Sequence, residues 1–101
     1  MAEAAFDLQR RGDALAVACS GAWVVSAVKM VDEAMRAISP ELDQPVTVDL
    51  GQVERVDSAG VMLIARLQRR LVAEGHPVQV IGAPEAQRPL FAAINELEIA
   101  P

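Results

Sequence analysis

The residues best placed to do chemistry in this sequence are the neighbouring Asp57 and Ser58. They follow an apolar run at residues 46–50 and precede a long stretch in which apolar residues recur with helical spacing. This order predicts a hydroxyl group at a helix N-terminus, where free N–H groups and the helix dipole favour a phosphate or a partner. A purely structural alternative stays open, because an Asp or Ser N-cap is worth about 1 kcal/mol over Ala and either residue could be the cap.

Other candidate catalytic groups lack partners at a useful spacing. His76 lies in a Gly-His-Pro sequence with no Cys, Asp or second His at metal-ligand spacing. The single Cys19 has no His beside it and is expected to be a buried, apolar-like residue. Asp49 and Asp57 are the carboxylates expected near one strand end, but neither is paired with a catalytic nucleophile or a metal ligand. With no Gly-rich phosphate loop either, we predict that the chain is not an enzyme and holds no cofactor or metal.

Length, charge and composition limit the partners. The 101 residues suit a single domain, residues 1–101, and an apolar fraction of 52% indicates a globular fold. The net charge of −5 disfavours nucleic acid and anionic lipid, both of which require clustered Lys and Arg. We expect a cytoplasmic protein, because the sequence has one Cys, no apolar run near the ~20 residues of a membrane span, and no signal-peptide pattern.

The first half of the chain predicts an antiparallel hairpin followed by a helix. Strands are expected at residues 6–10 and 14–19, the second ended by Ser20 and Gly21. Apolar residues then recur four and three apart between residues 24 and 38, which is the stripe of an amphipathic helix. This stripe consists of Val24, Val28, Val31, Met35 and Ile38.

The second half predicts alternating strands and helices. Residues 46–50 and 78–81 are expected strands, with a helix between them from Ser58 to about residue 74. Pro89 falls inside a last helix at residues 85–94, so that helix starts late or is kinked. The expected buried residues are Gly60, Leu63, Ile64, Leu67 and Leu71 in the first of these helices, and Leu90, Phe91, Ile94 and Leu97 in the last. The order ββαβαβα predicts an α/β fold, in which a mixed sheet opens with an antiparallel hairpin, continues in parallel strands and carries helices packed against it.

This element order, together with the motif Val-Asp-Ser-Ala-Gly at residues 56–60, resembles the STAS domains. These are small cytoplasmic modules of anti-sigma factor antagonists and of several transporters. The similarity runs from Val46 to Phe91 and includes the helix after the motif, the strand at 78–81 and the Arg-Pro-Leu-Phe segment at 88–91. In the antagonists, a kinase phosphorylates the hydroxyl residue directly after the motif's Asp. The resemblance therefore implies that Ser58 is a phosphorylation site that switches partner binding.

The sequence differs from the antagonists at two places, and there it is more similar to a transporter branch of the family. The antagonists carry an acidic turn after their second strand, where this chain has Gly-Ala-Trp-Val at residues 21–24, and they favour a second Ser where it has Ala59. A Gly-x-Trp turn followed by Asp-Ser/Thr-Ala-Gly is more similar to the STAS module of Mla-type phospholipid ABC transporters. That resemblance implies a regulatory module that binds the transporter's cytoplasmic ATPase, at the inner membrane. The alternatives are a free antagonist switched by phosphorylation of Ser58, and an α/β interaction domain with neither partner.

The predicted partner surface surrounds the start of the helix at Ser58. Met62, Arg66 and Arg69 recur on the outer side of that helix, as a partner surface or as a solvated face. Trp23 is either a core residue or an interface anchor, since Trp is enriched at binding hot spots. The residues expected to contact the partner are Trp23, Asp57, Ser58, Ala59, Gly60, Met62 and Arg66.

Overall fold

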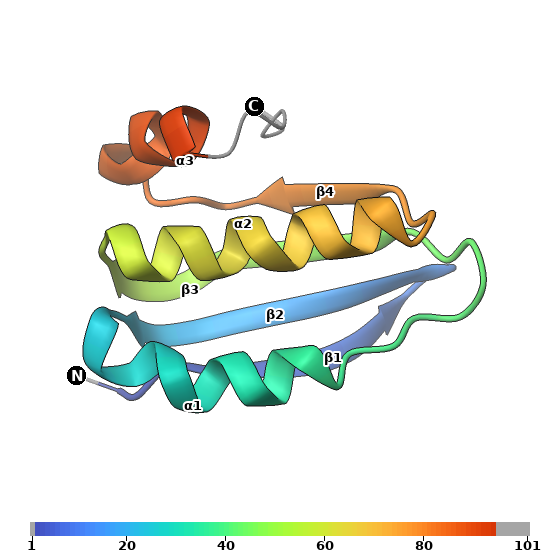
Figure 1. Cartoon of the computed structure of the whole chain (residues 1–101), viewed down its shortest axis with the longest axis horizontal. Helices are drawn as coiled ribbons and strands as arrows, with labels where there is room; N and C mark the ends of the chain where they lie inside the picture. Colours follow the sequence, from blue (N-terminus) through green and yellow to red (C-terminus); the bar gives the residue numbers. More distant parts are fainter. Residues whose placement is uncertain (1, 95–101) are drawn as a thin grey trace.

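A single four-stranded sheet, in the order β1-β2-β3-β4, forms the frame of the structure, a computed structural model that describes residues 2–94 (Figure 1). β1 (Ala5–Arg11) and β2 (Ala14–Trp23) form the predicted antiparallel hairpin. β2 then pairs in parallel with β3 (Val46–Val56), and β3 with β4 (Val78–Ile81). The predicted α/β class, mixed sheet and element order are confirmed.

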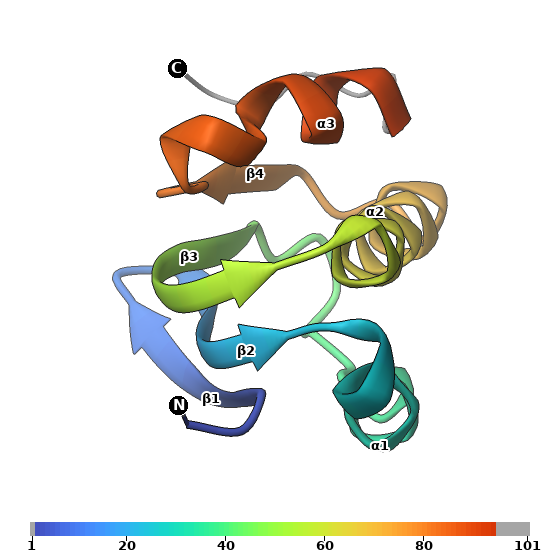
Figure 2. The same cartoon turned by 90° about the vertical axis from the view of Figure 1, so that its left-hand side faces the viewer.

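Two long helices cover one face of this sheet. α1 (Val25–Arg36) connects β2 to β3, and α2 (Ser58–Ala73) connects β3 to β4. Figure 2 shows the two helices side by side on the same side of the strands. A 3-10 turn (Glu85–Gln87) and α3 (Arg88–Ile94) lie at the β4 edge, where α3 packs against α2. No helix among residues 2–94 is long and apolar enough to cross a membrane.

The hydrophobic core lies between the sheet and these helices, and it is mainly aliphatic. The α2 residues predicted to face inward are all buried, and so are the last three of the α1 stripe, Val31, Met35 and Ile38. Phe91 is buried and Leu90 is half-buried, whereas the predicted burial of Ile94 and Leu97 concerns side chains outside those described. The apolar spacing in the sequence therefore located the core faces of both long helices.

α3 begins later than residue 85, the expected start of the last helix. A late start was one of the two predicted effects of Pro89, and a kink was the other. The helix begins at Arg88, so Pro89 is its second residue. The missing N–H of proline has no consequence in a first turn, because the N–H groups there have no partner within the helix.

Two strands are longer than predicted. Ser20 and Gly21 do not end the second strand, because β2 continues to Trp23 through register shifts on either side of them. Gly21 has a φ of 81°, a conformation that glycine tolerates, and pairing with β3 resumes beyond it. β3 likewise continues past residue 50 to Val56. The added residues lack the apolar alternation that marks a strand, but their backbone groups stay paired.

α2 approaches the end of β2 so closely that Gly60 has no room for a side chain. A Cβ atom on Gly60 would overlap the carbonyl oxygen of Trp23 and would lie 2.8 Å from Cγ2 of Val56. The start of α2 is therefore held directly against the ends of β2 and β3.

Replacing Gly60 with Ala should lower the free energy of unfolding by about 1–3 kcal/mol, as expected for overpacking. In an exposed helix the same change would raise stability by about 0.5–1 kcal/mol, so the sign of the effect is diagnostic. Urea unfolding of wild type and Gly60→Ala measures it. A more stable variant would contradict the close approach of α2 to Trp23.

Candidate functional site

The carboxylate of Asp57 lies where the two long helices begin. Its Oδ1 accepts hydrogen bonds from the backbone N–H groups of Ala59, at 3.0 Å, and Gly60, at 3.2 Å. Its Oδ2 accepts the N–H of Val25, the first residue of α1, at 3.0 Å. One side chain thus caps α2 and binds the start of α1, while the N–H of Asp57 donates to the carbonyl oxygen of Trp23 at 3.3 Å.

This geometry settles which of the two motif residues is the cap. The N-cap is Asp57, and Ser58 is the first residue of α2. A carboxylate has two oxygens and can accept from both helices at once, which a single hydroxyl group at this position would not do. Ser58 itself is exposed at the helix end. The hydroxyl is therefore placed at a helix N-terminus, as expected, but it is not the capping group.

The pKa of Asp57 lies below its ordinary value. Partial desolvation raises it, but the N–H donors of Val25, Gly60 and Ala59 together favour the ionised carboxylate more strongly. The positive charge of Arg55 adds a smaller effect in the same direction. Asp57 is thus negatively charged at neutral pH, at the point where the positive ends of both helix dipoles converge.

Besides Ser58, three of the predicted partner contacts lie on the surface or close to it. Met62 is 52% exposed and Arg66 is exposed, both on the same face of α2 as Ser58, and Ala59 is half-buried beside Ser58. Met62 and Arg66 follow Ser58 at steps of four residues, so the three side chains form one row along the helix.

Trp23 and Gly60, which were expected among the partner contacts, are buried, so of the two alternatives for Trp23 the structure shows the core residue. The Trp23 side chain is fully buried, and its indole N–H donates to the carbonyl oxygen of Ser20 at 2.8 Å. Gly60 is buried against the carbonyl group of Trp23. Both residues help to position the start of α2, because the absence of a side chain at Gly60 lets the helix approach the Trp23 carbonyl group.

Three other candidate groups, Cys19, His76 and Asp49, lie away from this junction and are accounted for by burial or by a structural contact. Burial raises the pKa of Cys19 to about 12, with a further contribution from the charge of Asp49, so its thiol stays protonated. His76 is buried, with Nδ1 3.0 Å from the carbonyl oxygen of Gln44. Asp49 forms an ion pair with Arg11 at 2.9 Å. Residues 2–94 contain no group of three or more His, Cys, Asp or Glu side chains arranged to hold a metal.

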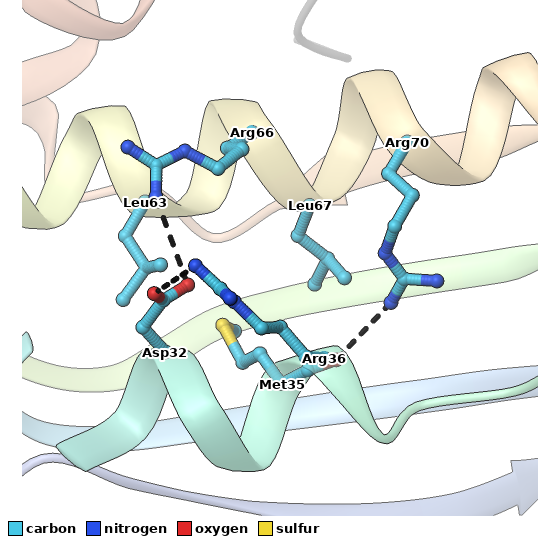
Figure 3. Close-up of a pocket in the computed structure, with 7 residues that line it drawn as sticks. All are labelled: Asp32, Met35, Arg36, Leu63, Arg66, Leu67 and Arg70. Carbon is cyan, nitrogen blue, oxygen red and sulfur yellow. Dashed lines mark hydrogen bonds and ion pairs between the residues drawn. The ribbon is translucent and has the colours of Figure 1, made fainter. Parts of the chain in front are cut away.

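The sequence did not reveal a groove between α1 and α2, which is lined by charged and apolar residues from both helices (Figure 3). Among the residues that line this groove, the sequence pattern indicates only the contact between Asp32 and Arg36, which are four residues apart on one helix. The contacts across the two helices depend on how the helices pack.

Replacing Asp57 with Ala should lower the free energy of unfolding by about 2 kcal/mol, the upper end for an N-cap, because the N–H of α1 also loses its acceptor. Ser58→Ala is the matched control and should stay within about 0.5 kcal/mol of wild type. Because folding lowers the pKa of Asp57, its contribution is complete above the unfolded-state pKa of about 3.9. It is lost as the pH falls through the lower folded-state value. Chemical unfolding across this pH range measures both effects, and an equal loss in the two variants would contradict the assignment of the cap.

Comparison with known proteins relates the whole domain to one family. A family model described as "Mlab, STAS domain" matches residues 6–96. A search of curated proteins finds no match. Because the family model covers nearly the whole sequence, it establishes membership.

Solved structures share the fold. The anti-sigma factor antagonist SpoIIAA in its unphosphorylated form has a TM-score of 0.62 at 18% identity, over 87% of this chain and 82% of that one. A crystal structure of Mglu has a TM-score of 0.62 at 30% identity, over 78% of this chain. The match spans only 19% of that Mglu chain. The SpoIIAA-like fold and the family match together indicate a regulatory protein-interaction module, and the protein belongs to the STAS-domain family.

Proposed function

We propose that this domain binds the cytoplasmic ATPase subunit of a phospholipid ABC transporter and supports its assembly or activity. The contact surface is the α2 face that carries Ser58, Met62 and Arg66. In this role the domain acts at the cytoplasmic face of the inner membrane, without chemistry of its own.

The observation that carries the proposal is the exposed row on α2. Met62, with 52% of its surface exposed, lies between a hydroxyl group and a guanidinium group on one helix face. Met and Arg are both enriched at protein interfaces relative to other surface residues. The row also begins at the end of α2, where Asp57 accepts two N–H groups of α2 and one of α1, so little conformational entropy is lost when a partner binds.

The family description supports the transporter as partner, since the matching model carries the Mlab designation. The segment at residues 21–24 also lacks the acidic residues that the antagonists have there. Asp57, Gly60 and Trp23 take no direct part in this proposal. They hold the α2 face in place.

A second candidate function is supported by the exposure of Ser58 and by the likeness to SpoIIAA. In that function the domain is an anti-sigma factor antagonist whose Ser58 is phosphorylated by a serine kinase. A phosphate adds about −1.5 to −2 charges at neutral pH. The N-terminus of α2 stabilises that charge, whereas a partner with acidic or apolar groups facing Ser58 is repelled. Phosphorylation would then abolish binding without unfolding the domain.

For the transporter function, Met62→Asp should weaken binding to the ATPase subunit of its own host by about tenfold or more, as at an interface hot spot. Met30→Asp is the matched control, because Met30 is 71% exposed but lies on α1, next to the N-terminal strand β1. Co-expression of the two proteins followed by a titration of the purified pair measures both variants. Equal affinities for the two variants would exclude the α2 face as the binding surface.

For the antagonist function, a serine kinase captured from the host should place phosphate on Ser58 stoichiometrically, as measured by mass spectrometry of the intact protein. Ser58→Asp should lose the kinase partner and Ser58→Ala should keep it, because only Asp adds a negative charge at the end of α2. If both substitutions leave every interaction unchanged, Ser58 is not part of the binding site.

A further inference from the structure

The groove between α1 and α2 has an apolar floor. Met35 from α1 and Leu63 and Leu67 from α2 meet across the helix interface and are each at least 95% buried (Figure 3). The cavity above them has a volume of about 280 Å³. This is just below the ~300–1,000 Å³ of sites that enclose small organic ligands. Its size therefore suits one or two aliphatic side chains that enter from a partner.

The rim of the groove carries an excess of positive charge. Asp32 forms an ion pair with Arg36 at 3.1 Å through one oxygen and approaches Arg66 at 3.8 Å through the other. Two guanidinium groups thus share one carboxylate. Their side chains are 71% and 64% exposed, respectively, and the Arg66 contact is longer than a hydrogen bond. Each guanidinium has five N–H donors, so most of them are available to a second carboxylate.

Arg70 closes one end of the groove and is already engaged. It donates to the carbonyl oxygens of Met35, at 3.1 Å, and Ile38, at 3.2 Å, and it pairs with Glu74. This arrangement fixes the distance between the two helices, so the groove exists before a partner arrives. Arg66 lines the groove and also belongs to the α2 row, in which exposed Met62 lies one turn before it.

We infer that the α1–α2 groove binds an acidic, aliphatic peptide segment of the partner protein. An aliphatic side chain of that segment rests on Met35, Leu63 and Leu67. A neighbouring carboxylate of the segment binds Arg36 and Arg66. These two arginines share only the carboxylate of Asp32, so one positive charge is left in excess. The inference rests on the proposed function of α2 as a docking face, and it adds the chemistry of the segment that docks. This positive site stands out on a chain whose net charge is −5.

A membrane surface is the less favoured occupant. Recognition of anionic lipid requires a cluster of about 4–8 Lys or Arg side chains. The groove has three arginines, and the carboxylates of Asp32 and Glu74 offset two of their three positive charges. The apolar floor is also recessed between two helices, so a flat bilayer would not reach it.

The test selects binding peptides from a phage-displayed library of random dodecapeptides, with the full chain immobilised. It requires no transporter subunit, so its failure is distinct from a failure of the proposed ATPase partner. The expected result is enrichment of peptides that combine Glu or Asp with Leu or Ile. Their affinity should fall roughly tenfold in the double variant Arg36→Gln/Arg66→Gln, as the loss of two exposed charge pairs predicts.

The matched control is Arg10→Gln/Arg88→Gln, which removes two exposed arginines elsewhere on the surface. This control should bind the selected peptides like wild type, and both double variants should unfold at the wild-type urea concentration. Absence of enrichment, selected peptides that lack carboxylates, or equal binding by the groove variant and the control would each overturn the inference. Binding to phosphatidylglycerol vesicles that requires Arg36 and Arg66, without peptide enrichment, would assign the groove to lipid instead.

Discussion

The arrangement of both long helices depends on one carboxylate. The first N–H groups of any helix have no partner within it, and in this fold two helices begin at the same corner of the sheet. Asp57 accepts one of these groups from α1 and two from α2. Hydrogen bonds to a charged group contribute about 1.5–3 kcal/mol each. The negative charge also compensates the positive ends of two helix dipoles, so Asp57 is stabilised in its ionised form.

α1 is held at its other end by a charge of opposite sign. The guanidinium group of Arg70, from α2, donates to the carbonyl oxygen of Met35 in the last turn of α1, where the dipole is negative, and to that of Ile38 just after the helix. A carboxylate at the first turn and a guanidinium group at the last thus fix α1 relative to α2. The apolar stripes of the two helices are buried against the sheet, and these polar contacts determine how the helices are aligned with each other. The groove between the helices is a consequence of that alignment.

The two residues of the Asp-Ser motif have different roles, and this has a functional consequence. Asp57 performs the capping, and this leaves Ser58 exposed on the surface. A modification of Ser58 or a partner bound there would leave the three hydrogen bonds of the cap intact. Gly60 and Trp23 act beneath this surface, because their close backbone contact determines how α2 meets the sheet. Met62 and Arg66 are exposed and take no part in that contact.

The sequence by itself determined the element order, the mixed sheet and the buried faces of α1 and α2, because apolar periodicity along a segment is a local property. It also placed a hydroxyl group at the start of α2. It could not reveal that β2 and β3 continue beyond their apolar alternation, since that depends on pairing between distant strands.

Only the tertiary structure decided that Asp57 binds the start of α1 as well as that of α2, that Trp23 and Gly60 are buried, and that arginines from two helices share Asp32. These features arise where α1 and α2 meet each other and the ends of β2 and β3. The residues that meet there are more than thirty positions apart in the chain. Val25 and Asp57, for example, form a hydrogen bond across a separation of 32 residues. No local pattern encodes such a contact, because packing brings its two sides together.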